Sequence, residues 1–211
     1  IKYGEKLVYA EHQLTSDKVY SMAQQTANWL ISMDISPKDR ILVEQLPFPQ
    51  NEILAFGIWT LGASMVLTGD YNIEDATKYA SPSLIINTDV NYFEKIKTFS
   101  KDYNPTYKPL LSDEAMIFWK EGKGIKLSHY NLLVNANGTQ HAIDLFEDQT
   151  FHVNLEPRSM AWVILQVILP LYSGAPLTSK KPDIRLGEKK GDFIIKFQWK
   201  ELKKTDPPSL Y

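Results

Sequence analysis

Cysteine is absent from the 211-residue chain, so neither a disulfide bond nor a zinc site with cysteine ligands can form. The absence is typical of a reducing compartment, and the cytoplasm is therefore the expected location. Histidine is also scarce, with four residues, and no two of them have the short spacing that brings two imidazoles to one metal ion. The sequence therefore predicts no metal site of the protein's own.

The chain also lacks a strong charge of either sign and a long apolar run. A net charge of −2 provides no overall attraction to nucleic acid or to an anionic membrane surface. The longest apolar stretch begins at Met160 and is interrupted by Gln166 and Pro170, which makes it too short to span a bilayer. We therefore expect no nucleic-acid partner and no membrane span, and we interpret this stretch as a buried helix.

Apolar strands alternate with helical periods along most of the chain. Strands are predicted at residues 40–46, 63–68, 83–87, 115–119, 149–154 and 193–199, and helices at residues 16–33, 50–61, 74–80, 128–145 and 160–171. Strands that are apolar on both faces and alternate with helices are typical of a parallel sheet covered on both sides. The predicted fold class is therefore α/β, a layered and mostly parallel sheet flanked by helices.

The segment "AMIFWKEGKGIKLSHYNLL" contains the candidate binding site of the sequence. We expect a loop with two glycines and two lysines that leads directly into a helix beginning at Ser128. Backbone N–H groups at the start of a helix favour a phosphate group, which makes Gly122, Lys123 and Gly124 the candidate phosphate-binding residues. The alternative is a plain turn with a solvated lysine, in which Ser128 only caps the helix.

Two further residues raise the same choice between packing and binding. Gly138 is predicted in the middle of a helix, where an exposed glycine costs about 1 kcal/mol relative to alanine. Close packing or a ligand would explain it, and we favour packing. Trp162 lies on an apolar helix face, and we expect it in the core rather than in the wall of a substrate pocket.

Five segments, taken in order, resemble the AMP-forming adenylating enzyme superfamily. This superfamily contains acyl- and aryl-CoA synthetases, luciferases and the adenylation domains of peptide synthetases. The similar segments are "LTSDKVYSMAQQTANWLISMDISPKDRILVEQL", "PQNEILAFGIWTLGASMVLT", "SPSLIINTD", "KGIKLSHYNLL" and "ILPLYSGAPL". No single motif is specific, and the resemblance depends on their order along residues 5–178.

The resemblance implies the N-terminal large-domain part of an acid–thiol ligase of the acyl-CoA synthetase type. Such an enzyme uses ATP and Mg²⁺ to convert a small carboxylic acid into an acyl-adenylate, and CoA or the thiol of a carrier protein then accepts the acyl group. The implied division is an AMP-binding domain, complete or incomplete, over residues 1–178, and a partial subdomain or linker over residues 179–211.

The sequence departs from the family pattern at the phosphate loop, "(S/T)SG(S/T)TGxPKG". Lys123 and Gly124 match its final two residues, but about four residues of its glycine and hydroxyl core have no counterpart. The family's histidine near Ser159 and its later "YGxTE" and "TGD" motifs are also absent. Either the chain is a fragment without its ligand loops, or it is a non-catalytic relative that binds nucleotide or a partner. We favour the fragment, because the fold-forming segments are kept; activity of this chain alone is then not expected.

Overall fold

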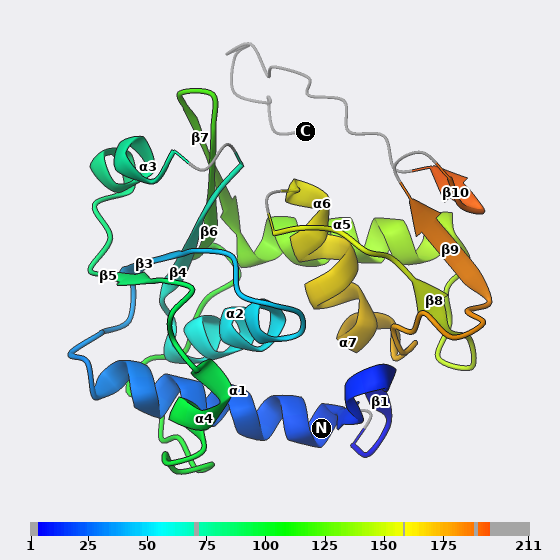
Figure 1. The fold of residues 1–211 in the computed structure, drawn as a ribbon, viewed down its shortest axis with the longest axis horizontal. Helices are drawn as coiled ribbons and strands as arrows, with labels where there is room; N and C mark the ends of the chain where they lie inside the picture. Colours follow the sequence, from blue (N-terminus) through cyan, green and yellow to red (C-terminus); the bar gives the residue numbers. More distant parts are fainter. Residues whose placement is uncertain (1–3, 70–71, 158, 188–189, 195–211) are drawn as a thin grey trace, which may run out of the picture.

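The computed structural model describes residues 4–69, 72–157, 159–187 and 190–194 (Figure 1). Its main sheet has five strands in the order β5-β3-β4-β6-β7. The first four are parallel and β7 is antiparallel to β6. The strands are β3 (Arg40–Val43), β4 (Ser64–Thr68), β5 (Leu84–Ile86), β6 (Glu114–Lys120) and β7 (Lys123–Ser128). The predicted α/β class with a mostly parallel sheet is confirmed.

Helices cover both faces of this sheet, and two small sheets lie beside it (Figure 1). The helices are α1 (Ser16–Ile31), α2 (Gln50–Leu61), α3 (Ile73–Ala80), α4 (Tyr92–Ile96), α5 (His129–Ala142), α6 (Met160–Trp162) and α7 (Leu169–Ser173), with a 3₁₀-helix η1 (Ala10–His12) and a π-helix η2 (Val163–Ile168). The short strands are β1 (Leu7–Tyr9), β2 (Leu14–Thr15), β8 (Phe151–His152), β9 (Ile184–Gly187) and β10 (Phe193–Ile194). None of the helices within the described ranges is long and apolar enough to cross a membrane.

The two central strands send their following helices to opposite faces of the sheet. Helix α2 follows β3 and packs in the larger core, where Ile53 lies with Val43. Helix α3 follows β4 and packs in a smaller core on the other face, where Ala76 lies with Val66. Because successive side chains of a strand point to opposite faces, one strand supplies residues to both cores. The loops after β3 and β4 therefore diverge at the carboxyl edge of the sheet.

The glycines within α2 and α5 differ in their surroundings. A Cβ on Gly57 of α2 would lie 2.2 Å from the Cβ of Thr26, so the glycine lets α1 and α2 approach closely. A Cβ on Gly138 of α5 would meet no described atom within 4 Å. The prediction that close packing explains Gly138 is therefore wrong, and among the described residues the structure gives no packing reason for it.

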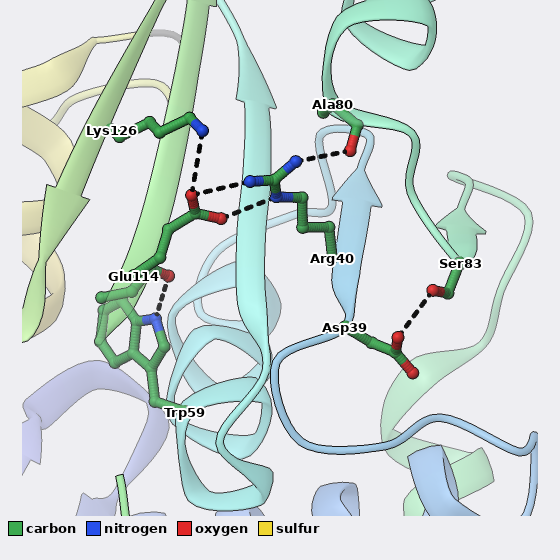
Figure 2. Close-up of polar contacts among 8 residues, drawn as sticks. Asp39, Arg40, Trp59, Ala80, Ser83, Glu114 and Lys126 are labelled. Atoms are coloured by element: carbon green, nitrogen blue, oxygen red, sulfur yellow. Dashed lines mark hydrogen bonds and ion pairs between the residues drawn. The ribbon is translucent and has the colours of Figure 1, made fainter. Parts of the chain in front are cut away.

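An arginine crosses the sheet at its amino edge (Figure 2). Arg40 on β3 lies opposite Ser64 on β4, and its guanidinium group reaches past this small residue to Glu114 on β6. Nε donates to Oε1 at 2.8 Å and Nη2 to Oε2 at 3.0 Å, while Nη1 donates to the carbonyl of Ala80 at the end of α3. One side chain thus connects β3 to β6 across the intervening β4, and to the end of α3.

We expect Glu114→Gln to lower the free energy of unfolding at neutral pH by about 1–2 kcal/mol, because it removes a charged acceptor from a half-buried pair. Partial burial alone would raise the pKa of Glu114, but the hydrogen bonds from Arg40 and Ser64 and the charges of Arg40 and Lys126 together outweigh it and lower the pKa. A lowered pKa adds stability above the ordinary carboxyl range, and that stability is lost as pH falls through the folded-state value. Urea unfolding between about pH 3 and pH 7 should therefore show a shallower acid decline for the variant.

Glu94→Gln is the matched control, because Glu94 pairs with Lys97 while both side chains are more than half exposed. The control should change stability by less than about 0.5 kcal/mol at any pH. Equal losses in the two variants would contradict a structural role for the Arg40–Glu114 pair.

Several predicted elements differ from the observed ones at their boundaries. The predicted helix over residues 160–171 is α6, η2 and α7 in succession. Pro170 has no N–H to donate to the carbonyl four residues earlier, and regular α-helical bonding is interrupted just before it. The predicted strand 149–154 is reduced to β8, and residues 195–199 of the predicted strand 193–199 lie outside the described residues. The division at residue 178 stays a prediction. Strand β9, which follows residue 178, pairs with β8, which precedes it.

Candidate functional site: a crevice at the carboxyl edge of the sheet

A crevice lies where the loops after β3 and β4 diverge. Its volume is about 480 Å³, and residues from Val43 to Pro47 form one wall. The other lining residues are Leu67, Thr68, Ile73, Thr88 and Pro157. Crevices at this position of an open parallel sheet are the usual ligand sites of α/β proteins, and volumes of about 300–1,000 Å³ are typical of small-molecule sites. The topology therefore makes this crevice the candidate functional site.

The lining combines an apolar body with a few polar groups. Leu46, Leu67 and Ile73 provide apolar surface, whereas Glu44 contributes a carboxylate and Thr68 a hydroxyl. The backbone N–H of Glu44 donates to the carbonyl of Ile86, which ties this wall to β5. Among the described lining residues none is lysine or arginine. The crevice therefore suits an uncharged ring or acyl chain better than a phosphate group.

The candidate phosphate-binding residues lie at the tip of a β-hairpin beside this crevice. Strands β6 and β7 are joined by Glu121 and Gly122 alone, with φ of 52° and 73°. Positive φ at both central residues is the conformation of a tight type I′ turn. Thr68 of the crevice pairs with Trp119, the second-last residue of β6. The turn between β6 and β7 therefore follows at the same edge of the sheet, where the hairpin extends outward (Figure 1).

The predicted loop that leads directly into a helix is wrong. Lys123–Ser128 form β7, and six extended residues separate the hairpin tip from α5 by about 20 Å. The tip and the first turn of α5 therefore cannot hold the same phosphate group. The start of α5 is satisfied internally, because Ser128 and Asn131 form a reciprocal capping box. Ser128 is thus confirmed as the helix cap.

Each of the three candidate residues has a defined place in the hairpin. Gly122 provides the left-handed conformation that the turn requires. A Cβ on Gly124 would lie 2.2 Å from the ring of Tyr79, so this glycine makes room for an aromatic side chain. Lys123 lies directly opposite Lys120 in the register of the two strands. Packing and turn geometry therefore account for both glycines, and phosphate binding by the three residues stays a prediction.

His129 lies against an aromatic side chain at the start of α5. Its ring meets that of Trp59 edge to face at a centroid distance of 6.1 Å. Burial lowers the pKa of His129, and the nearby Asp113 only partly opposes this effect. The imidazole is therefore neutral at physiological pH, which gives it no charge with which to hold a phosphate.

A buried carboxyl group that the sequence does not predict lies on α2, the helix that follows the wall from Val43 to Pro47. Glu52 of α2 is 1% exposed, and its Oε1 accepts hydrogen bonds from Trp162 Nε1 at 2.7 Å and from Gln166 Nε2 at 2.8 Å. Burial raises the pKa of Glu52, and these hydrogen bonds only partly oppose the increase. The sequence signals for this group are the single polar residues Glu52 and Gln166 within otherwise apolar helical segments. Trp162 is fully buried, which confirms its predicted place in the core.

The fold is that of the N-terminal part of AMP-forming acyl-CoA synthetases and adenylation domains. The similar solved structures include NpsA-ThdA, an artificially fused adenylation–PCP di-domain from Klebsiella oxytoca, with 16% identity and a TM-score of 0.71 over 84% of this chain and 37% of that chain. ATP-bound MatB from Rhodopseudomonas palustris has 14% identity and a TM-score of 0.63 over 78% of this chain and 39% of that chain.

A fatty acyl-adenylate ligase from L. pneumophila, in complex with acyl adenylate and pyrophosphate, has 19% identity and a TM-score of 0.64 over 79% of this chain and 34% of that chain. The chain thus spans between about a third and two fifths of the length of these three proteins. No protein-family model and no curated protein sequence matches the chain.

Proposed function

We propose that this chain is the N-terminal large-domain part of an AMP-forming acid–thiol ligase. In this proposal ATP activates a small carboxylic acid as an acyl-adenylate, and CoA or a carrier-protein thiol accepts the acyl group. The observation that supports it is a crevice at the carboxyl edge of a sheet whose fold is shared with an ATP-bound and an acyl-adenylate-bound protein. The division into residues 1–178 and 179–211 belongs to the same proposal.

The crevice and the hairpin tip have complementary chemistry for such a ligand. The apolar lining around Leu46 and Leu67 suits the uncharged part of an adenylate, and the hydroxyl of Thr68 offers a hydrogen bond. Gly122, Lys123 and Gly124 would contact the phosphate groups from the hairpin tip. Lys120 and Lys123 lie directly opposite one another, so an anion at the hairpin tip would meet two cations, of which Lys120 also pairs with Glu121 at 3.8 Å.

Magnesium would arrive with the nucleotide in this proposal. Within the described ranges no three histidine or acidic side chains are grouped closely enough to hold a metal ion. Mg²⁺ usually keeps several waters and binds through substrate phosphates with one or two carboxylates. Glu44 is the carboxylate that lines the crevice, so it is the protein group that fits this role.

The two-residue hairpin turn favours a second candidate function. A turn closed by Glu121 and Gly122 has too few backbone N–H groups to surround a triphosphate. A non-catalytic relative that binds nucleotide or a partner in the crevice would need no such cradle. This candidate keeps the crevice as a binding site and removes the chemical step.

Thermal unfolding with Mg·ATP separates these candidates from a chain with no nucleotide affinity. A ligand at 100 times its dissociation constant stabilises the folded state by about 2.7 kcal/mol. We expect this stabilisation in the wild type, a clear reduction in Lys123→Gln, and no reduction in Lys101→Gln, which changes an exposed lysine in the loop after α4. Absence of stabilisation at saturating ATP would contradict the ligase and the nucleotide-binding form of the second candidate, and would leave a partner as the ligand of a non-catalytic relative.

Pyrophosphate exchange into ATP, with a panel of small carboxylic acids, then distinguishes the two candidates. Acid-dependent exchange supports the ligase, because only formation of an acyl-adenylate makes the release of pyrophosphate reversible. Because activity of this chain alone is not expected, only the presence of acid-dependent exchange distinguishes the candidates; ATP binding without exchange agrees with both.

A further inference from the structure

We propose that Glu52 is a positioning residue that, in its neutral form, holds together the two walls of the crevice. The proposal rests on the crevice being the binding site of the proposed function. One wall is the segment from Glu44 to Pro47, which leads into α2. The other is the segment from Leu155 to Pro157, which leads towards α6; Pro47 and Pro157 both line the crevice.

A short chain of buried hydrogen bonds connects these walls. Glu52, in the first turn of α2, accepts from Gln166 Nε2 at 2.8 Å. The other amide atom of the same side chain, Gln166 Oε1, accepts from the backbone N–H of Leu155 at 3.0 Å. Two hydrogen bonds through one side chain therefore connect the helix behind the first wall to the start of the second.

One further hydrogen bond helps to fix the position of Gln166. Its backbone carbonyl accepts from the hydroxyl of Tyr9 at 3.1 Å. Gln166 lies in the π-helix η2, whose wider turns are uncommon and are frequently found at functional sites. Trp162, one turn earlier, donates to the same oxygen of Glu52. The carboxyl group of Glu52 therefore accepts hydrogen bonds from two side chains, one on α6 and one on η2, which follow the second wall.

The charge state of Glu52 determines whether this arrangement is favourable. Its Oε2 is buried and has no hydrogen-bond partner among the described residues. A neutral carboxyl leaves no uncompensated charge, whereas an ionised one would place a negative charge in the core without a cation, which is strongly unfavourable. Ionisation of Glu52 would therefore favour a conformation in which water reaches Oε2. In this proposal, α2 and η2 move apart to admit the water.

Among the described residues, no positively charged side chain contributes to the pKa of Glu52. Helices α2, α6 and η2 have no other ionisable side chain. Tyr9 is buried beside the cluster, and the carboxyl group of Glu52 adds to the effect of burial in raising the pKa of this hydroxyl. Glu156 in the second wall is exposed, and His12 packs on the ring of Phe48 in the segment before α2.

The expected consequence is a crevice whose affinity for its ligand falls as pH rises. Burial raises the pKa of Glu52, so the neutral form persists above the ordinary carboxyl range and is lost as pH passes the folded-state value. The stability that depends on the neutral form is then lost in the same direction. Glu52→Gln keeps an acceptor oxygen for Trp162 and Gln166 and cannot ionise. It should therefore keep the two walls connected at all pH values.

Adenosine is the probe for the affinity measurement, because it has no phosphate group to titrate. Calorimetric titration from about pH 5 to about pH 9 should show wild-type affinity decreasing by about tenfold as Glu52 ionises. Glu52→Gln should bind with constant affinity. Glu74→Gln, the same change at an exposed position of α3, should behave as the wild type.

Two structural readouts do not depend on ligand binding. The indole N–H of Trp162, assigned by comparison with Trp162→Phe, should titrate in the NMR spectrum of the wild type and not in Glu52→Gln. The amide of Leu155 should lose protection from hydrogen exchange at high pH in the wild type, relative to Glu52→Gln at the same pH.

These measurements show separately whether the proposed function of the crevice fails and whether the proposed role of Glu52 fails. Absence of adenosine binding at every pH contradicts the proposed function of the crevice, while the Leu155 amide still tests the positioning role. Equal protection of Leu155 in wild type and Glu52→Gln at high pH overturns the role of Glu52. A pH-dependent affinity that persists unchanged in Glu52→Gln also overturns it.

Discussion

Replacing Trp162 by alanine is expected to lower the free energy of unfolding by about 3–5 kcal/mol, the range for large aromatic residues removed from a core. The side chain has no exposed surface and its indole N–H donates to Glu52. The substitution therefore leaves a cavity and also removes one of the two donors from a buried carboxyl group. Urea unfolding of the two proteins at neutral pH measures the difference.

Trp162→Phe is the control that separates packing from hydrogen bonding. It keeps most of the buried ring but removes the donor, so we expect a loss of about 1–3 kcal/mol, the cost of leaving a buried polar group unsatisfied. The alanine variant should then be clearly less stable than the phenylalanine variant. A loss below about 1 kcal/mol for alanine would contradict the placement of this residue in the core.

Gly57→Ala is expected to destabilise the fold by about 1–3 kcal/mol, although alanine is the better helix former. The added methyl group would lie 2.2 Å from two carbon atoms of Thr26, and α1 and α2 would have to separate to admit it. The hydroxyl of Thr26 is also bonded to that of Tyr92, so movement of α1 would disturb α4 as well. Thermal or urea unfolding measures the effect.

Gly138→Ala is the matched control, because it makes the same change within a helix where the new methyl group meets open space. It should stabilise the protein by up to about 1 kcal/mol, the difference in helix propensity. Opposite signs for the two variants are the expected result. Stabilisation by both would show that α1 and α2 do not meet at Gly57.

The sheet could be predicted from sequence because its strands carry a local pattern. β3, β4 and β6 are apolar on both faces, which indicates a strand buried between two layers of helices. The capping role of Ser128 was likewise local, since it depends on residues three positions apart. Both features are determined by short segments and need no knowledge of distant contacts.

The hairpin could not be predicted in the same way. β7 alternates Ile125 and Leu127 with polar residues, but this signal is short and lies beside a turn of unusual composition. Glutamate with positive φ, as at Glu121, is uncommon, and the usual two-residue signals are Asn-Gly and Asp-Gly. The local pattern therefore indicates a loop, whereas the antiparallel pairing with β6 makes it a strand.

The crevice and its supporting network depend on contacts between distant segments. The hydrogen bond between Glu52 and Gln166 joins residues 114 positions apart, and the π-helix that carries Gln166 is set by such contacts together with Pro170. The position of the crevice follows from which face each helix covers. That information is absent from the local periodicity of either helix.

Strand β7 lies at one margin of the main sheet, where a strand offers backbone N–H and C=O groups to other strands. Lysines on such a margin oppose the lateral joining of two molecules, because pairing would bring cations together. Lys123 and Lys126 lie on this strand, so we expect them to oppose such pairing whether or not a ligand is bound. We expect neutral substitutions there to favour self-association, so the molecular mass in solution has to be known before a loss of ATP binding is assigned to Lys123.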